Sequence, residues 1–153
     1  SEITPEIPIL IISGNHDSPD RLKYASEILK RHHIYLAGNV PERPEEHIEK
    51  VTLHDAYGEV DFYLLPFLKP GYVRELFAEK ELKFDLVFLD PPYAKEKIAK
   101  DMLQMNKLGL LNDDAIVVAE TDDHTELGPI EGFSLVKEHH LGKTIVRIYR
   151  KDK

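Results

Sequence analysis

The stretch that decides the fold is KFDLVFLDPPYAKEKIAKDM, residues 83–102. Its first part, 84–90, is an almost unbroken apolar run, which is typical of a strand buried in a sheet. Two prolines follow, and they hold the chain extended and end the strand. Over residues 94–106, Ile98, Met102 and Met105 recur at helical spacing on one face. The stretch therefore predicts a strand, a turn and a helix, as in an α/β sheet.

The same layout occurs near the start of the sequence. IPILIIS at 7–13 is a second apolar run, ending at a glycine, and predicts a strand buried on both faces. Residues 18–33 predict a helix, because Ser18 suits the N-cap and apolar residues recur at helical spacing. A short strand at 34–38 and a polar loop at 39–47 are expected to follow.

Two hairpins and one further buried strand complete the expected elements. The first hairpin is expected to pair 48–55 with 59–67, and the second lies within 132–151 and turns at 141–143. AIVVAE at 115–120 predicts a third buried strand, and 70–82 a short helix or turn. We therefore expect an α/β protein with a mixed, largely parallel sheet, flanking helices and antiparallel hairpins.

The composition is that of an ordinary globular protein. The 153 residues are 42% hydrophobic and 31% charged, with a net charge of −8. The acidic balance argues against a broad nucleic-acid surface, so nucleic-acid binding is expected only to be weak. There is no cysteine, which excludes disulfides and thiolate zinc sites. No apolar run has the length of a membrane span, and no signal peptide is recognised, so a cytoplasmic protein without a membrane partner is expected.

Gly14-Asn15-His16-Asp17 is the first candidate site. Asn15 offers an amide oxygen that suits Mn²⁺ or Mg²⁺. His16 can donate a proton or bind a phosphate oxygen, and Asp17 can orient the imidazole. The end of a buried strand, just before a helix, is a favourable place for an anion.

IPILIISGNHDSPDRL at 7–22 and FYLLPFLKPGYVRELF at 62–77 resemble the SbcD nuclease, a calcineurin-like metallophosphoesterase. The resemblance covers residues 6–79. It implies that Asn15 is a metal ligand and that His16 contacts the scissile phosphate. The family's Asp-x-His and Gly-Asp-x-x-Asp motifs do not occur before Asn15, and its Gly-His-x-His motif does not occur after it. We therefore expect only weak, vestigial metal binding at Asn15 and His16, and His16 and Asp17 as remnants of a catalytic site.

Asp90-Pro91-Pro92-Tyr93 is the second candidate site. The two prolines leave the Asp90 side chain and nearby carbonyl groups available to accept hydrogen bonds from an exocyclic amine. Tyr93 can stack on a planar base. These properties suit an N-methyltransferase that acts on nucleobases.

The segment that starts at this site resembles the C-terminal half of RsmD, a 16S rRNA guanine-N2 methyltransferase that uses S-adenosylmethionine. The resemblance rests on residues 83–102, on LGLLNDDAIVVAET at 108–121 and on the terminal IYRK, and it covers 82–151. It implies that Asp90, Pro91, Pro92 and Tyr93 hold the target base. No Gly-rich cofactor motif such as Asp-x-Phe-x-Gly-x-Gly occurs, so S-adenosylmethionine is not expected to bind.

The two resemblances meet at about residues 79–83. We therefore interpret the chain as a laboratory-recombined chimera of two unrelated α/β fragments, 1–81 and 82–153, that merge into one domain without intact catalytic function. Two alternatives stay open: rRNA guanine-N2 methyltransferase-like RNA binding, and exonuclease-like binding of Mn²⁺ or Mg²⁺. The fragments are expected to cover each other's apolar faces, or the chain to form a homo-oligomer.

Four other polar groups have simpler interpretations. ETDDHTE at 120–126 is expected to be a solvated acidic loop, with a divalent-ion site as the alternative. His32 and His33 are expected to end a helix, and His139 and His140 to lie on opposite faces of a strand. The basic end formed by Lys143, Arg147, Arg150 and Lys151 fits an RNA contact or an exposed, charge-protected strand equally well.

Overall fold

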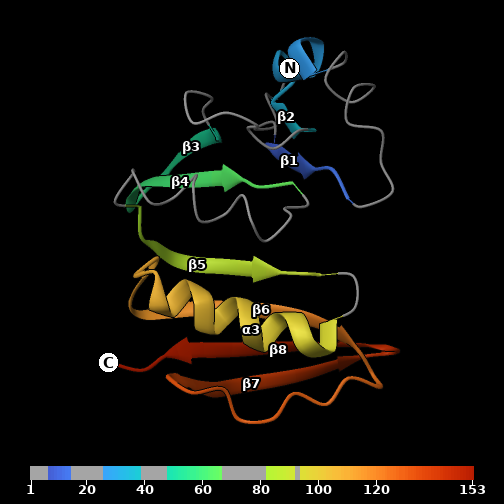
Figure 1. The fold of residues 1–153 in the computed structure, drawn as a ribbon. Helices are drawn as coiled ribbons and strands as arrows, with labels where there is room; N and C mark the ends of the chain where they lie inside the picture. The colour runs from blue at the N-terminus through green and yellow to red at the C-terminus, as the bar shows by residue number, and fades with distance from the viewer. Residues whose placement is uncertain (1–6, 15–25, 39–47, 67–81, 92–93) are drawn as a thin grey trace. The chain divides into compact units, whose positions relative to one another are not determined.

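The protein is a strand-rich mixed α/β chain that divides into two compact units, Ser1–Leu76 and Phe77–Lys153 (Figure 1). A computed structural model describes residues 7–14, 26–38, 48–66, 82–91 and 94–153. Each unit is described by itself. The expectation that the two parts of the chain merge into one domain stays a prediction.

In the first unit, β1 (Ile9–Ile12) and β2 (Ile34–Ala37) form a parallel pair. The predicted strand at 34–38 is therefore confirmed. Residues 26–30 are helical and end in a turn at 31–33, where the His33 amide donates to the Lys30 carbonyl at 3.2 Å. The first part of the helix predicted at 18–33 lies outside the described residues.

The first hairpin is also confirmed. It consists of β3 (Glu49–Asp55) and β4 (Gly58–Leu64). The Asp55 carboxylate accepts hydrogen bonds from the backbone amides of Tyr57 and Gly58 at 2.7 and 3.1 Å, which closes the turn. Across the two strands, Asp61 accepts from Thr52 at 2.7 Å. A small buried cluster of Ala37, Val51 and Leu64 forms the core of this unit.

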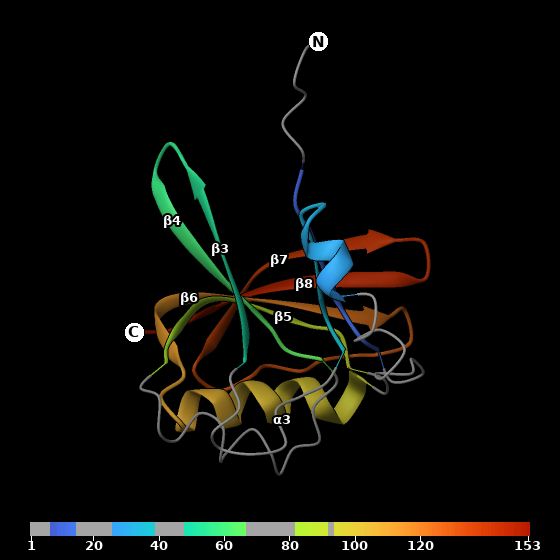
Figure 2. The same cartoon turned by 90° about the horizontal axis from the view of Figure 1, so that it is seen from above.

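The second unit contains one four-stranded sheet and the helix α3 (Figures 1 and 2). Along the sheet the order is β5-β6-β8-β7. The β5 and β6 strands are parallel, and both pairs that involve β8 are antiparallel. The elements are β5 (Phe84–Leu89), α3 (Ala94–Lys107), β6 (Leu111–Asp122), β7 (Phe133–Leu141) and β8 (Thr144–Lys151).

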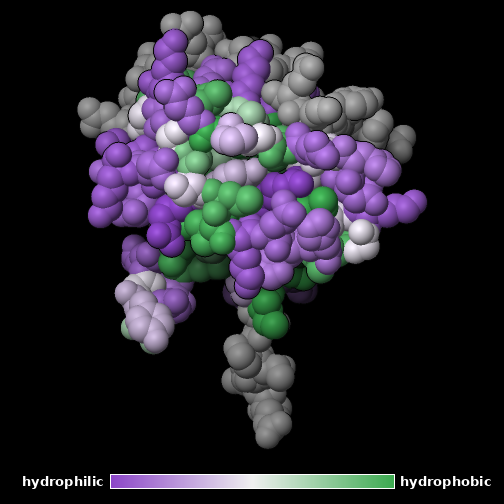
Figure 3. Space-filling view, turned by 90° about the horizontal axis from the view of Figure 1, so that it is seen from below, coloured by the Kyte–Doolittle hydropathy of each residue, from purple (hydrophilic) through white to green (hydrophobic). Residues whose placement is uncertain are grey.

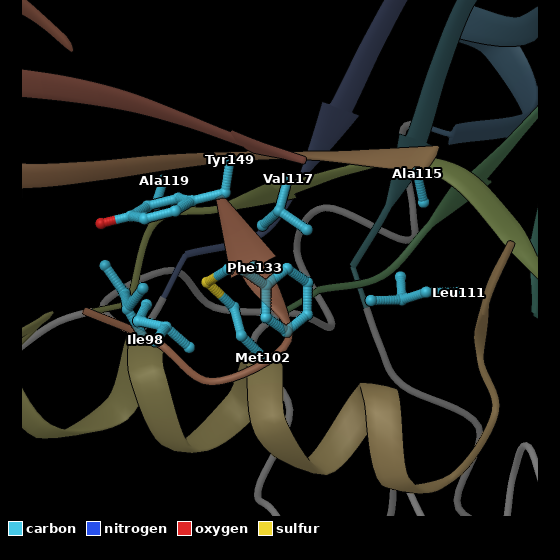
Figure 4. Close-up of a cluster of buried hydrophobic side chains, with 9 residues drawn as sticks. Ile98, Met102, Leu111, Ala115, Val117, Ala119, Phe133 and Tyr149 are labelled. Carbon is cyan, nitrogen blue, oxygen red and sulfur yellow. The ribbon is translucent and has the colours of Figure 1, made fainter. Parts of the chain in front are cut away.

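The core of the second unit lies between α3 and one face of this sheet (Figure 4). Ile98 and Met102 are completely buried, as their helical spacing predicts. They pack in a cluster that also contains Leu111, Ala115, Val117, Ala119, Ile130, Phe133 and Tyr149. The predicted third buried strand is confirmed within β6, and the second hairpin within 132–151 is confirmed as β7 and β8.

Two parts of the expected fold are wrong. The expected sheet was largely parallel, but three of the five strand pairs in the described residues are antiparallel. Two of these three, β3 with β4 and β7 with β8, are joined by two-residue turns, which can only connect antiparallel neighbours.

The other error concerns strand burial. In β1, Ile9 and Ile12 are 49% and 51% exposed, and in β5, Leu86 and Phe88 are 50% and 71% exposed. Within the second unit, α3 covers only one face, and Leu86 and Phe88 are paired with Ile116 and Val118 of β6 rather than with core residues. Figure 3 shows apolar side chains between polar ones on one face of the molecule.

Among the described residues, no helix combines the length and the apolar character that crossing a membrane requires.

Candidate functional site

Of the four candidate base-binding residues, Asp90 and Pro91 lie at the carboxyl edge of the second unit's sheet. Since β5 and β6 are parallel, their carboxyl ends meet at this edge, where open α/β sheets bind their ligands. Asp90 follows β5 directly and is exposed, and Pro91 is partly exposed. Pro92 and Tyr93 lie outside the described residues, immediately before α3. The assignment of a target base to these four residues stays a prediction.

A row of four paired residues crosses the whole sheet just before Asp90. Leu89 of β5 pairs with Ala119 of β6, Ala119 pairs with Arg147 of β8, and Arg147 pairs with Glu138 of β7. Ala119 belongs to the buried core, and Leu89 packs against it. In this row the apolar side chains of β5 and β6 therefore meet the polar side chains of β8 and β7.

Arg147 is the centre of a polar network in this row. It is only 6% exposed. Its Nε donates to Glu138 Oε2 at 2.6 Å, and its Nη1 donates to Thr121 Oγ1 at 2.7 Å. The second carboxylate oxygen of Glu138 lies 2.8 Å from His140 Nε2. The network thus links the carboxyl end of β6 to β8 and β7 through directional, charge-assisted hydrogen bonds.

The network keeps Glu138 ionised. The hydrogen bond with His140 lowers the pKa of the Glu138 carboxyl, and the hydrogen bond from Arg147 lowers it further. On the same face of β8, burial raises the pKa of the Tyr149 hydroxyl. Because the Glu138 carboxylate balances the guanidinium charge, Arg147 acts as a structural cation and has no free charge for a ligand.

The acidic segment that follows β6 is organised by its own turn. Asp122 Oδ1 accepts from the Thr125 hydroxyl at 2.7 Å and from the His124 amide at 3.1 Å. The hydrogen bond from Thr125 is the main reason why the pKa of Asp122 lies below its usual value. No group of three or more His, Cys, Asp or Glu that could hold a metal ion occurs in the part of the chain that the structure describes. The expected acidic loop is confirmed only for residues 123–126, because Glu120, Thr121 and Asp122 belong to β6 and Thr121 and Thr125 are buried.

The prediction of a basic surface near the C-terminus is wrong for two of its four residues, Arg147 and Lys151. Arg147 is buried, and Lys151 Nζ is held by Asp113 Oδ1 at 2.8 Å. The burial of Arg147 could have been predicted from the sequence. Ile145, Arg147 and Tyr149 occupy every second position of one strand, so their side chains must share a face. All three are buried, at 5%, 6% and 3% exposure. His139 and His140 are consecutive in β7, as the prediction of opposite faces requires, and both are exposed.

Of the first candidate site, the structure describes only the strand end that leads into it. Ser13 is buried, and its hydroxyl donates to the Gly38 carbonyl at 2.7 Å. This bond ties the segment after β1 to the segment after β2. Asn15, His16 and Asp17 lie outside the described residues, so their expected roles stay predictions.

The model of the family described as Conserved hypothetical protein 95 matches residues 71–150, just over half of the chain. The chain belongs to this family. A relative named "Putative rRNA methyltransferase YlbH", from Bacillus subtilis, is 33% identical over 75 residues. That match covers 48% of this chain and 41% of the relative.

Outside the Conserved hypothetical protein 95 family, the chain is similar to a second class of protein. The SbcD component of the SbcCD nuclease from Staphylococcus saprophyticus is 32% identical over 77 residues, which are 50% of this chain and 18% of the nuclease. The Staphylococcus epidermidis protein of the same name is 32% identical over 78 residues, 51% of this chain and 19% of the nuclease. The chain therefore spans less than half the length of each of these curated relatives.

Solved structures share the fold of this chain. A conserved hypothetical protein from Streptococcus pyogenes aligns with a TM-score of 0.57 and 21% identity, over 95% of this chain and 72% of that one. The protein titled "Putative methyltransferase yhhF from Escherichia coli" aligns with a TM-score of 0.51 and 16% identity, over 95% of this chain and 65% of that one. At these identities the likeness establishes the fold alone.

Proposed function

We propose that this chain binds RNA as rRNA guanine-N2 methyltransferases do and that Asp90, Pro91, Pro92 and Tyr93 hold a target base. The observation that carries the proposal is the family match over 71–150, together with the place of Asp90 at the carboxyl edge beside β6. An exposed carboxylate there can accept hydrogen bonds from the exocyclic amine of guanine. Tyr93 follows three residues later and supplies a ring on which the base can stack.

The proposed activity is binding without methyl transfer. These 153 residues contain no Gly-rich strand–loop–helix segment of the kind that binds S-adenosylmethionine, and methyl transfer needs that cofactor. The net charge of −8 keeps the RNA affinity low, because phosphate contacts require concentrated Lys and Arg. The target base, more than the RNA backbone, then decides which RNA binds.

Fluorescence anisotropy with a short single-stranded RNA that contains one guanine tests this proposal. Asp90→Ala and Tyr93→Ala should each weaken binding about tenfold, the effect of losing one base contact. Replacing the guanine with inosine, which lacks the exocyclic amine, should weaken binding to the wild type but not to Asp90→Ala. A matched control is Asp85→Ala, on the same strand, since Asp85 lies near its amino end and accepts from Asn112 at 2.8 Å. Equal affinities of Asp90→Ala and the wild type would rule out the base contact.

We also propose that the chain joins two enzyme fragments, with 6–79 related to the nuclease and 82–151 to the methyltransferase. In support, the two classes of curated relative each match about half of the chain. The nuclease-like fragment then binds Mn²⁺ weakly at Asn15 and His16 and cleaves no phosphodiester.

A thermal melt with and without Mn²⁺ tests the metal site. Mn²⁺ at a concentration equal to its Kd should stabilise the wild type by only about 0.4 kcal/mol. The small upward shift in Tm should disappear in Asn15→Ala and in His16→Ala. A shift that persists in both variants would place the ion elsewhere, and Mn²⁺-dependent cleavage of a phosphodiester by the pure wild type would contradict the fragment interpretation.

A further inference from the structure

We propose that Arg147 is a positioning residue for the carboxyl edge of the second unit's sheet. In this proposal Arg147 holds the end of β6 in place beside the point where Asp90 leaves β5. The consequence for RNA rests on the function proposed above, but the structural part can be measured without RNA.

The reach of the Arg147 side chain is the first argument. Its backbone pairs with Ala119, but its Nη1 donates to Thr121, two residues nearer the carboxyl end of β6, at 2.7 Å. Thr121 is 4% exposed and is the last buried residue of that strand. Since Leu89 pairs with Ala119, the chain leaves β5 level with the Arg147 backbone and within two residues of Thr121. Neighbouring strands lie only about 4.8 Å apart, so a shift at the end of β6 reaches Asp90 directly.

The pairing of β7 with β8 is the second argument. Leu135 pairs with Tyr149, and a register shift between Leu135 and Lys137 then places Glu138 opposite Arg147. Without that extra residue, Lys137 would oppose Arg147, and the Glu138 side chain would lie on the other face of the sheet. The register shift in β7 therefore places the Glu138 carboxylate beside the buried Arg147 guanidinium.

The chemistry of the network is the third argument. A buried ion pair is often no more stabilising than apolar side chains of similar volume, so stability alone gives little reason to place an arginine here. What a guanidinium adds is direction, because its planar fork fixes the angles of the bonds it makes. Here the fork joins Glu138 on one side to Thr121 on the other.

Amide hydrogen exchange of the full chain tests the positioning role, with Arg147→Met compared with the wild type. We expect exchange to become about tenfold faster at the last three residues of β5 and of β6, with little change at the first residues of the same strands. The matched control is Lys151→Met, because Lys151 lies on the same strand and its ion pair with Asp113 is near the opposite edge. This control should leave the carboxyl edge unchanged. Equally faster exchange throughout the unit would overturn the proposal, since a general loss of stability would explain it.

Two further variants keep the test decisive if Arg147→Met does not fold. Thr121→Val removes the bond from Arg147 to β6, together with the 3.5 Å bond from the Thr121 hydroxyl to the Ile145 carbonyl. It leaves the Arg147–Glu138 pair, so it should give the same local pattern. Arg147→Lys keeps the charge but lacks the fork that spans both partners, so it should not restore the slow exchange. Full protection in Arg147→Lys would show that charge, not direction, matters, and would overturn the proposal.

RNA binding then separates this inference from the proposed function. In the guanine-RNA assay, Thr121→Val should weaken binding severalfold, less than Asp90→Ala, because it displaces the contact without removing it. Local exchange changes with unchanged RNA affinity would overturn the positioning role. No RNA binding by the wild type would overturn the proposed function instead and would leave the exchange result standing.

Discussion

Arg147 and Glu138 lie directly opposite each other on β8 and β7, joined by a 2.6 Å hydrogen bond, but they are buried to very different degrees. The Arg147 side chain is 7% exposed and that of Glu138 is 34% exposed. The two ends of the pair are therefore not equivalent. Loss of the carboxylate leaves a charge in the core, whereas loss of the guanidinium leaves a carboxylate that water and His140 can still solvate.

This asymmetry predicts the order of two substitutions. Glu138→Ala should lower the free energy of unfolding at neutral pH more than Arg147→Met, which replaces the buried charge with an apolar side chain of similar length. Urea denaturation of both variants measures the order. The double variant should be more stable than Glu138→Ala alone, since it removes the unpaired cation. A less stable double variant would contradict this account.

The low pKa of Glu138 predicts a loss of stability in acid. Its hydrogen bonds lower the pKa below the usual 4.5, so the native state binds this proton less readily than the unfolded state. The resulting stability is complete above the unfolded value and is lost as the pH falls through the native pKa. Melts at a series of pH values from neutral to about 3 should show wild-type Tm falling more steeply than that of Glu138→Gln. If the Tm of both proteins falls equally steeply with pH, the Glu138 carboxylate does not cause the loss of stability in acid.

The packing of α3 predicts a large effect at Met102. Met102 is completely buried, so Met102→Ala should reduce the free energy of unfolding by about 3 kcal/mol through the lost contacts and the remaining cavity. The matched control is Leu103→Ala on the same helix, where the side chain is 42% exposed. That substitution should cost less than about 1 kcal/mol. Urea denaturation measures both, and similar costs would show that α3 does not pack on the sheet through this face.

The turn between β7 and β8 predicts a backbone effect at Gly142. Its φ is +67°, and nothing lies within 4 Å of an added Cβ, so Gly142→Ala meets no clash but must adopt a left-handed conformation. The expected cost is about 1 kcal/mol. Gly128→Ala is the control, since its surroundings are equally open and its φ lies outside the left-handed range. Thermal melts should show a lower Tm only for Gly142→Ala.

The spacing of apolar residues in the sequence predicted many of the helices and strands, but it did not predict correctly how deeply each strand is buried. The helical spacing of Ile98 and Met102 correctly indicated the face that α3 buries, because a helix presents one stripe whatever it packs against. The apolar run at 84–90 correctly indicated a strand but wrongly indicated that the strand is buried, since Phe88 is 71% exposed. An apolar run looks the same whether a layer covers one face or both.

At the candidate site, too, the sequence determined some features and the tertiary structure determined others. The sequence by itself determined that Asp90 follows a strand and precedes a helix, because two prolines end the strand there and apolar helical spacing begins soon after. Only the tertiary structure decided that Arg147 is buried opposite Glu138 and bonded to Thr121. That arrangement depends on the register of three strands and on one extra residue in β7. Register is set by pairing between residues far apart in the chain, and a slip of one residue would reverse the face of every side chain in the strand.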